Sequence, residues 1–535
     1  MTVVQRAHNQ PPPLEGYDLY GENRPLGEGV AREGASWADE RLRSIGRVLG
    51  GEPLELGRLA NENPPRLRTH DRFGERIDEV EFHPAWHALL GLGVEHGLHA
   101  SPWRESRDGA HVARAAAFIT LAEVEAGVGC PLSMTFAALP ALRAEPSVLD
   151  EWESLLTSSV YDPGLRPAAD KAGALCGMAM TERQGGSDVR ANETVARRAG
   201  DDEATLHGHK WFCSAPMCDA FLVLAQAPAG LTCYLLPRVL PDGARNAFRI
   251  DRLKDKLGNR SNASAEIQLE GAWARRVGEE GRGVSTIIEM VVHTRLDCVL
   301  GSTGLMRRAV AEATHHAAHR AAFGRPLVEQ PLMENVLADL CIESEAATLL
   351  ALRLAHAYDD GDVAFRRLAT TVAKYWVCKA TPPLVAEALE CIGGNGYVEE
   401  SVLPRLYRES PLNSVWEGPA NVQALDVLRA LQRQPESADA VLREIELAAG
   451  LDSRLDVSVA ALRAALADVE EWSARRLVEK IALCLTGSLL VRHGAPAVAD
   501  AFCATRLGGD GGRSYGTLPR GVDASAIVER HRPRV

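Results

Sequence analysis

The chain of 535 residues is 46% hydrophobic and 24% charged, and its formal net charge at pH 7 is −13. This composition is ordinary for a globular protein, and the length predicts about three or four domains. The negative charge argues against nucleic-acid binding by the whole chain, because it would repel phosphate. The N-terminal residues lack the apolar segment of a secretory signal, and the eleven scattered cysteines form no C-x-x-C pair. We therefore expect a cytoplasmic protein with reduced thiols and no membrane partner.

The first predicted elements are a proline-rich extended arm and a mostly helical region, together residues 1–172. Within this region HVARAAAFITLAEVEAGV carries apolar residues at helical spacing, whereas NENPPRLRTHDRFGE (61–75) is typical of a loop. Short β-type runs separated by Gly, Pro, Asn and Asp follow over residues 173–278. They predict a compact antiparallel domain, either a sandwich or a barrel.

Long helices return over residues 279–434, and helices of such length generally bundle together. The first exceeds the usual length of a globular helix, so we expect a break near Gly301 to Gly304. QRQPESADA (432–440) is typical of a linker. Residues 435–535 then form a mostly helical extension that ends in a glycine-rich tail. The predicted fold class is α with a central β domain.

The stretch MTERQGGSDV (180–189) places two adjacent glycines between hydroxyl-bearing residues, just after an apolar run. Glycine gives the backbone conformational freedom and removes the Cβ atom. Either the chain simply turns here, or a ligand must approach the backbone closely. The stretch alone leaves both interpretations open.

Three further stretches carry chemistry when taken with this one: GHKWFCS (208–214), HRAAFGRPLVEQPLM (319–333), and ECIGGNGYVEESVLPRLYRESPLNSVWEGPANVQALDVLRAL (390–431). In this order and spacing they resemble the acyl-CoA dehydrogenase family of FAD flavoproteins. Within that family the chain is similar to the AidB branch, which belongs to the bacterial adaptive response to DNA alkylation. The similarity also includes LGRLANENPPRLRTHD and LKDKLGNRSNAS, and covers roughly the first 430 residues strongly.

The resemblance implies the acyl-CoA dehydrogenase fold: an N-terminal helical domain, an antiparallel β domain and a helical bundle, here with an added C-terminal helical domain. It also implies FAD as cofactor. The loop glycines would let backbone N–H groups reach the cofactor phosphates, which a Cβ would hold away. Aromatic side chains would lie beside the flavin ring, although packing in the core is an alternative for Trp211 and Phe212. The implied cofactor-binding residues are Met178, Met180, Thr181, Gly186, Ser187, Trp211, Phe212, Ser214, Arg320, Phe323, Gly394, Trp416 and Asn421.

Arg320 and Phe323 match an Arg-x-x-Phe-Gly element that reaches the FAD of a neighbouring subunit, so the resemblance implies a homo-oligomer, a tetramer in this family. A solvated charge at a helix end is the alternative for Arg320, because it would suit the helix dipole. His315 and His319 have the i, i+4 spacing of a metal pair. No third ligand lies nearby in the sequence, and we expect no metal.

Glu417 in VWEGPAN is the implied catalytic base, which removes the α-proton of an acyl-CoA thioester while the β-hydrogen leaves as hydride. Burial beside an apolar flavin would raise its pKa towards a useful range. A second lineage of the family carries its base on the long helix, where this chain has Thr294. Arg295 is implied as the second catalytic residue.

Three positions depart from the family pattern. Val292 replaces an acid that helps to hold the substrate, Glu390 replaces a glutamine, and Pro419 replaces a threonine. We expect these changes to leave FAD binding intact and to reduce turnover of short acyl-CoA thioesters.

The C-terminal extension is where the AidB branch is thought to hold double-stranded DNA. Residues 451–535 contain 12 Lys and Arg against 10 Asp and Glu, and the basic excess lies in the tail. Arg429, Arg506 and Arg513 are the implied DNA-binding residues, and a solvated surface of mixed charge is the alternative. Two functions stay open: a flavin oxidoreductase acting on an acyl-CoA or related thioester, and a DNA-associated flavoprotein that protects against alkylation.

Overall fold

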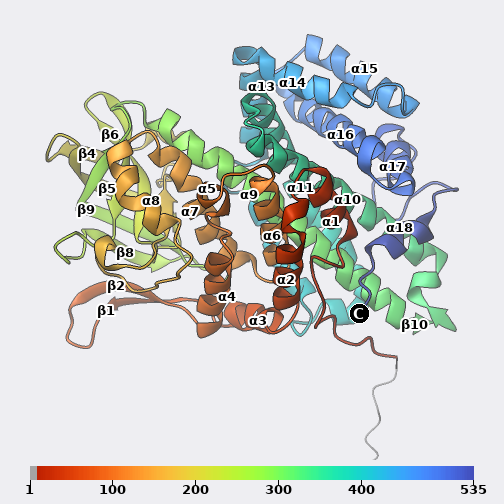
Figure 1. The fold of residues 1–535 in the computed structure, drawn as a ribbon, viewed down its shortest axis with the longest axis horizontal. Helices are drawn as coiled ribbons and strands as arrows, with labels where there is room; N and C mark the ends of the chain where they lie inside the picture. Colours follow the sequence, from red (N-terminus) through yellow and green to blue (C-terminus); the bar gives the residue numbers. More distant parts are fainter. Residues whose placement is uncertain (1–8) are drawn as a thin grey trace, which may run out of the picture. The chain divides into compact units, whose positions relative to one another are not determined.

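The computed structural model describes residues 9–535 (Figure 1). These residues form two compact units that alternate along the chain. The first comprises residues 9–52, His111–Glu123 and Cys298–Val535, and the second comprises Pro53–Ala110 and Val124–Asp297. The predicted fold class, α with a central β domain, is confirmed. The four domain boundaries drawn along the sequence stay a prediction.

The second unit begins with helices and a charged hairpin. Residues 61–75, expected to form a loop, include the first strand of this hairpin, in which β1 (Arg66–His70) pairs antiparallel with β2 (Arg76–Glu81). The loop prediction was wrong because the strands carry mostly charged side chains and lack apolar alternation. The helices of this unit are α3 (Pro53–Glu62), α4 (Pro84–Glu95), α5 (Ser101–Arg104), α7 (Gly129–Leu142) and α8 (Pro146–Leu156).

The sheet of the second unit is seven-stranded, in the order β3-β6-β4-β5-β9-β7, with β8 paired to β9. An additional β6–β7 pairing closes strands β6, β4, β5, β9 and β7 into a ring, which decides for a barrel over a sandwich. The strands are β3 (Cys176–Ala179), β4 (Val195–Arg198), β5 (Glu203–Ser214), β6 (Ala220–Ala227), β7 (Gly230–Pro237), β8 (Phe248–Leu253) and β9 (Ser264–Val277).

The prediction of a wholly antiparallel domain needs one correction, because β3 and β4 each pair parallel with β6. The antiparallel β4–β5 pair lies between β3 and β6 in the sequence, so the chain enters β6 in the direction of β3. The first six residues of β6 are fully buried, as expected of a strand covered on both faces.

The first unit is a helical bundle that includes α9 (Gly283–His319), a helix of 37 residues, from Cys298 onward. The expected break near Gly301 to Gly304 is absent from this helix. A Cβ at Gly304 would collide with the Ile119 carbonyl and with Ala122, so this glycine permits close helix packing. Other helices of this unit are α1 (Arg24–Arg32), α2 (Asp39–Leu49), α6 (Ala110–Ala122), α10 (Pro331–Asp359), α11 (Val363–Ile392) and α12 (Leu403–Glu409).

The C-terminal extension belongs to the core of the first unit. The stretch 432–440, expected to be a linker, is helical: α13 (Ala420–Arg433) and α14 (Pro435–Glu446) are separated by Gln434 alone. Pro435 stands in the first turn of α14, where proline is tolerated, so it begins a helix here. The later helices are α15 (Ser453–Ala467), α16 (Ala474–His493), α17 (Pro496–Phe502) and α18 (Ala524–His531), the last of which follows the glycine-rich stretch.

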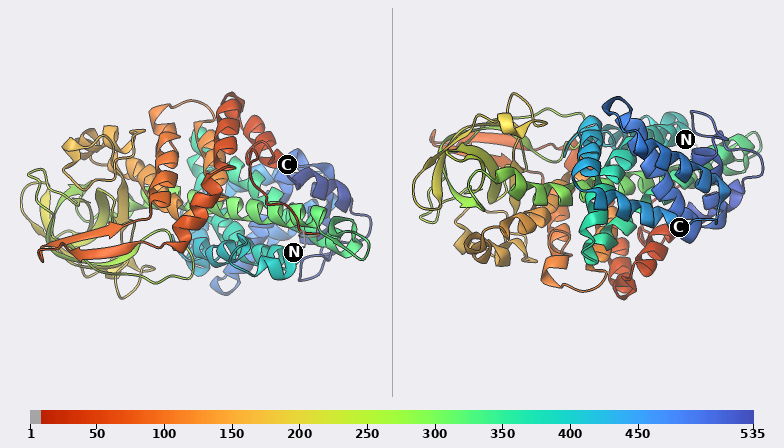
Figure 2. Two further views of the ribbon diagram at one scale, coloured as in Figure 1. Left: turned by 90° about the horizontal axis from the view of Figure 1, so that it is seen from below. Right: turned by 90° about the horizontal axis from the view of Figure 1, so that it is seen from above.

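Helix α16 packs against α10, α11 and α13, and α18 packs against α10. Figure 2 shows these blue helices lying along the green and cyan helices of the same unit in both views. Among residues 9–535, no helix has both the length and the apolar character that crossing a membrane requires.

Candidate active site

The glycine-rich loop 180–189 needs its glycines for two different reasons. Gly185 has a φ of +126°, a conformation that L side chains rarely adopt. A Cβ at Gly186 would collide with the Thr181 hydroxyl. The Trp211 N–H donates to the Thr181 carbonyl at 2.8 Å, which fixes one end of the loop to β5. Gly186 and Ser187 are exposed, so their backbone is accessible to a ligand.

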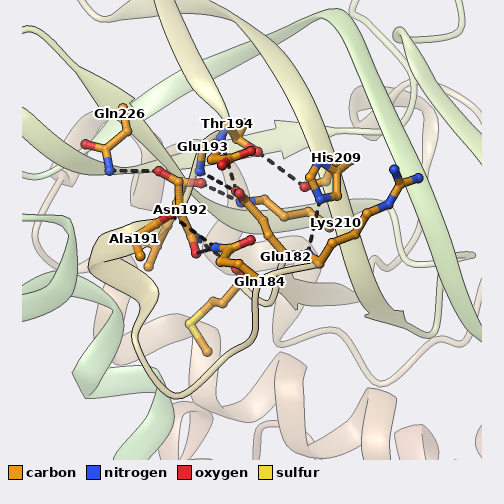
Figure 3. A network of polar contacts seen from close by, with 12 residues as sticks. Glu182, Gln184, Ala191, Asn192, Glu193, Thr194, His209, Lys210 and Gln226 are labelled. Atoms are coloured by element: carbon orange, nitrogen blue, oxygen red, sulfur yellow. Dashed lines mark hydrogen bonds and ion pairs between the residues drawn. The ribbon is translucent and has the colours of Figure 1, made fainter.

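A buried ion pair connects this loop to β5 (Figure 3). The Lys210 ammonium lies 2.6 Å from a Glu182 carboxylate oxygen, and neither side chain is exposed. The Glu193 and Thr194 N–H groups donate to the same carboxylate at 2.6 and 3.2 Å, and Lys210 also donates to the Leu224 carbonyl at 2.8 Å. Burial raises the pKa of Glu182, but Lys210 and these donors outweigh it, so the pKa lies below its usual value.

Asn192 closes the loop on its other side. Its side-chain amide donates to the Met180 carbonyl at 2.9 Å and accepts from Gln184 at 3.0 Å, while Gln226 donates to its backbone carbonyl at 2.9 Å (Figure 3). The sequence analysis missed Glu182, Lys210 and Asn192. A signal was present for Lys210, because a lysine within the apolar run of a strand implies a buried partner.

Trp211 and Phe212 lie in a β-bulge of β5. Lys210 pairs with Ile267 and Cys213 with Ala265, so two residues oppose one on β9. Bulges of this kind redirect side chains and are common beside active sites. Phe212 is 50% exposed, so the alternative that it packs in the core is wrong.

Cations surround the Trp211 ring. The Lys254 ammonium lies 3.5 Å from the ring centroid, and the Arg183 guanidinium carbon lies 5.5 Å from it. Ser214 has its hydroxyl 3.5 Å from that of Ser264. Met178 on β3 and Met180 directly after it are partly exposed. The second unit thus brings the loop, the aromatic bulge and positive charge together, an arrangement suited to an aromatic, anionic ligand.

Two positions on α9 bear on the choice of base. Thr294 is 4% exposed, and its hydroxyl donates to the Val291 carbonyl at 3.1 Å. It has no carboxylate and so offers no general base. Arg295 is 6% exposed, and its catalytic role stays a prediction.

In the first unit, Phe323 stands at the tip of a two-residue hairpin after α9. Its strands are β10 (Ala321–Ala322) and β11 (Arg325–Pro326). Phe323 and Gly324 have φ of 52° and 85°, as a type I′ turn requires. Phe323 is 99% exposed, so the hairpin presents a large apolar side chain outward.

The helix-end residues near this hairpin bind the N-terminal arm. Arg320 donates to the Asn9 carbonyl. His315 donates to the Pro12 carbonyl at 2.9 Å, and His319 donates to the His315 carbonyl at 2.9 Å. Within the described part of the chain, no group of three or more His, Cys, Asp or Glu residues is arranged to hold a metal ion.

Glu417 occupies a strained turn. Its φ is 57°, in the left-handed region that non-glycine residues rarely adopt, and Gly418 follows with φ of 96°. Buried Lys374 donates to the Trp416 carbonyl at 2.8 Å and to the Gly418 carbonyl. Buried Gln423 donates to the carbonyls of Glu417 and Gly418 at 2.9 and 2.8 Å. Two side chains from α11 and α13 thereby force the turn that presents Glu417.

The remaining predicted residues around this turn differ in exposure. The Trp416 indole N–H donates to Asn413 at 2.9 Å, which holds the ring in place. Gly394 and Asn421 are exposed. The sequence analysis missed Lys374 and Gln423, although the lysine in the apolar sequence VAKYWVCKA was a usable signal.

The basic tail has a different environment from the predicted one. The Arg506 side chain is only 16% exposed and lies 2.6 Å from Asp339 and 3.3 Å from Glu343, so its charge is already neutralised. This pairing argues against its predicted contact with DNA phosphate. Arg429 and Arg513 are exposed, and their DNA contact stays a prediction. Most other tail arginines also pair with acids: Arg530 with Glu28 and Glu345, and both Arg532 and Arg534 with Glu529.

Three family descriptions match successive parts of the chain. Residues 9–163 match the adaptive response protein AidB N-terminal domain. Residues 177–272 match the acyl-CoA dehydrogenase middle domain, and residues 281–432 match the acyl-CoA dehydrogenase C-terminal domain. The middle and C-terminal descriptions cover the candidate cofactor residues of both units and Glu417.

Whole-chain relatives agree with these matches. AidB of Escherichia coli (strain K12) is 47% identical over 511 residues, 94% of each chain. Acyl-CoA dehydrogenase family member 11 of Caenorhabditis elegans is 31% identical, over 84% of this chain and 79% of the relative. The crystal structure of Caenorhabditis elegans ACDH-11 with C11-CoA superposes with a TM-score of 0.84 at 27% identity, covering 95% of this chain and 93% of the other. These likenesses confirm the predicted fold.

Proposed function

The chain belongs to the acyl-CoA dehydrogenase family, whose members are FAD-dependent flavoproteins, and on that premise we propose that it dehydrogenates an acyl-CoA thioester. Glu417 is the base that takes the α-proton. The observation that carries this role is the turn itself, because a carboxylate held at φ of 57° by Lys374 and Gln423 is costly to keep without a function.

The loop and bulge of the second unit fit the cofactor. Exposed Gly186 and Ser187 offer backbone N–H groups for phosphates, and the Trp211 ring with its neighbouring cations suits a flat anionic dinucleotide. When bound, FAD supplies the hydride acceptor for the β-hydrogen. The protein's own task is to hold the thioester so that the α-proton faces the Glu417 carboxylate.

The base function of Glu417 depends on its surroundings. An exposed glutamate has a pKa near 4.3 and accepts a proton weakly at neutral pH. Glu417 is only partly exposed in the folded chain, and a bound acyl chain removes further water from it. Substrate binding therefore raises the basicity of Glu417 when it is needed.

The substrate class follows from the relatives. The Caenorhabditis elegans protein was crystallised with C11-CoA, so acyl-CoA thioesters of that length are the first to test. Val292 and Pro419 stand where the family pattern has polar residues, and we expect slower turnover with short thioesters. The test is an anaerobic panel of acyl-CoA thioesters, in which loss of the oxidised flavin absorbance reports reduction. No bleaching with any thioester would overturn the proposal.

We also propose that the working form is a homotetramer. Phe323 is almost fully exposed at the hairpin tip, and Arg320 lies at the base of the same hairpin. A large apolar side chain held in solvent favours contact with a second copy of the chain. Arg320 and Phe323 would then reach the FAD of that copy.

A second candidate function is association with double-stranded DNA. Similarity to the Escherichia coli relative covers 94% of the chain and so reaches into the C-terminal extension, and exposed Arg429 and Arg513 suit phosphate contact. Deleting the extension is a poor test, because α16 and α18 pack into the bundle. The sharper test compares duplex binding by wild type and by Arg429→Ala/Arg513→Ala across a salt series. Equal affinity and equal salt dependence would remove these residues from the DNA site.

A further inference from the structure

The N-terminal arm lies along the end of α9 and reaches the candidate cofactor residues of the first unit. Three of its backbone carbonyls accept hydrogen bonds from that helix and its extension. Leu14 accepts from Arg308 at 3.4 Å, Pro12 from His315 at 2.9 Å, and Asn9 from Arg320. The arm therefore runs antiparallel to the helix, and its first described residue, Asn9, lies beside Arg320.

Asn9 is bound to this position by its side chain as well as its backbone. Its amide accepts from the Ala321 N–H and donates to the Ala321 carbonyl, both at 2.8 Å, as a neighbouring strand would. Its φ is 58°, and asparagine tolerates this left-handed conformation better than most residues. The Asn9 carbonyl thus accepts one hydrogen bond from Arg320, and the Asn9 side chain makes two more with the following residue, Ala321.

The next residue of the arm contacts a different candidate element. The Asn395 side-chain amide donates to the Gln10 side chain at 3.2 Å. Asn395 belongs to the glycine-rich stretch Gly393–Gly396, which contains the predicted cofactor residue Gly394. Two adjacent residues of the arm therefore link the hairpin base to this stretch.

We propose that Asn9 and Gln10 form a clasp that positions Arg320 and the Gly393–Gly396 stretch for the dinucleotide. This rests on the proposed role of Arg320 in FAD binding. A free arginine side chain loses rotamer freedom when it is fixed on a ligand. The clasp restricts Arg320 before the ligand arrives, so less freedom is lost on binding. Both are positioning residues: Asn9 acts through Arg320, and Gln10 acts through Asn395 of the Gly393–Gly396 stretch.

The test measures FAD affinity of the full-length apoprotein by quenching of flavin fluorescence, which needs no turnover. Arg320→Ala should weaken binding at least tenfold. Asn9→Ala and Asn9→Gly should each weaken it about three- to tenfold, and the glycine variant keeps the backbone conformation while removing the amide. Gln10→Ala should have a smaller effect in the same direction. Glu15→Ala, an exposed residue of the same arm, is the matched control and should bind as wild type does.

The double variant Asn9→Ala/Arg320→Ala separates positioning from direct contact. Because Asn9 acts through Arg320, the double variant should bind FAD no more weakly than Arg320→Ala alone. Wild-type affinity in both Asn9 variants, or additive losses in the double variant, would overturn the clasp while leaving the Arg320 assignment intact. Wild-type affinity in Arg320→Ala would instead overturn the cofactor role of Arg320, and the clasp with it. Thermal unfolding of each apoprotein checks that the fold is retained.

Discussion

Glu182 and Lys210 form an ion pair that is buried completely, with 2.6 Å between the carboxylate and the ammonium. Buried pairs of this kind contribute less to stability than their attraction suggests, because both charges leave water. Removing one partner is strongly destabilising, because the other charge then stays buried without compensation. The pair joins the glycine-rich loop to the strand that carries Trp211, so its main value is to position the two.

Glu182→Gln is therefore predicted to lower the free energy of unfolding by about 3–5 kcal/mol and to loosen the loop. The unfolding temperature and the affinity for FAD should both decrease. Burial opposes the charge of Glu182, but Lys210 holds its pKa below the usual value, so its contribution is present at neutral pH and lost on acidification.

A matched control is Glu193→Gln, whose backbone N–H donates to Glu182 while its side chain is exposed. Glu193→Gln should have the same unfolding temperature as the wild type. Unchanged unfolding of Glu182→Gln would contradict the anchoring role of the pair.

The C-terminal helix α18 is fixed by a buried carboxylate, which gives a second prediction. Glu345 lies 3.1 Å from His531 and 2.8 Å from Arg530. Burial lowers the pKa of His531, but Cys341 and Glu345 outweigh it and raise the pKa to about 10. The folded pKa lies above the unfolded value, so this stabilisation is complete below about pH 6.5 and is lost as pH rises towards 10.

Glu345→Gln should weaken this dependence, because Cys341 still raises the pKa of His531. Its stability loss relative to wild type should be greatest near pH 6 and shrink towards pH 10, as measured by chemical unfolding at each pH. A loss that is constant over that range would show that His531 is uncharged in the fold.

Glu123 gives a third prediction, in which stability again falls as pH rises, here over a lower pH range. Its carboxylate is buried, and neither oxygen has a hydrogen-bond partner among the described residues. Burial outweighs the attraction of Arg307 and Arg308 and raises the pKa of Glu123 to about 7. The unfolded chain loses this proton at lower pH than the folded chain, so stability falls as pH rises towards 7.

Glu123→Gln should abolish that fall. A shift from 4.5 to about 7 corresponds to about 3 kcal/mol, so the variant should gain about that much relative to wild type between pH 4.5 and 8. Unfolding at these two pH values measures the difference. Equal gains at both would mean that folding does not raise the pKa of Glu123.

Phe323 provides a test of assembly. Phe323→Ser keeps the hairpin turn polar and exposed but removes the apolar tip, so the protein should shift to smaller species in sedimentation or light scattering. Leu332→Ser serves as a comparison, since Leu332 is also exposed, at 84%, but lies outside the hairpin. An unchanged mass for Phe323→Ser would exclude the hairpin tip from the subunit interface.

The sequence predicted the order of helical and β regions well, because apolar periodicity reports local structure. It failed where the determinant is non-local. Gly304 reads as a helix break but is required by the approach of another helix. Pro435 reads as a linker but stands where a helix can begin.

The candidate site also divides into residues that local motifs predict and residues whose partners only folding brings close. Glycines, aromatics and Glu417 were found from motifs, whereas Lys210, Lys374 and Gln423 were missed because their roles depend on carbonyls and carboxylates brought close only by folding. Arg506 was assigned to DNA from the resemblance to the AidB branch and from the basic tail, and its partners Asp339 and Glu343 are far away in the sequence.

The most direct test of the account is anaerobic stopped-flow reduction of the FAD-loaded protein by acyl-CoA thioesters, comparing wild type with Glu417→Gln. Glutamine is nearly isosteric and leaves the bonds from Lys374 and Gln423 to the backbone carbonyls in place, so folding and FAD content should not change. It cannot accept a proton, so flavin reduction should slow by about 10²- to 10⁴-fold. A Glu417→Gln rate equal to that of wild type would contradict the assignment of Glu417 as the base.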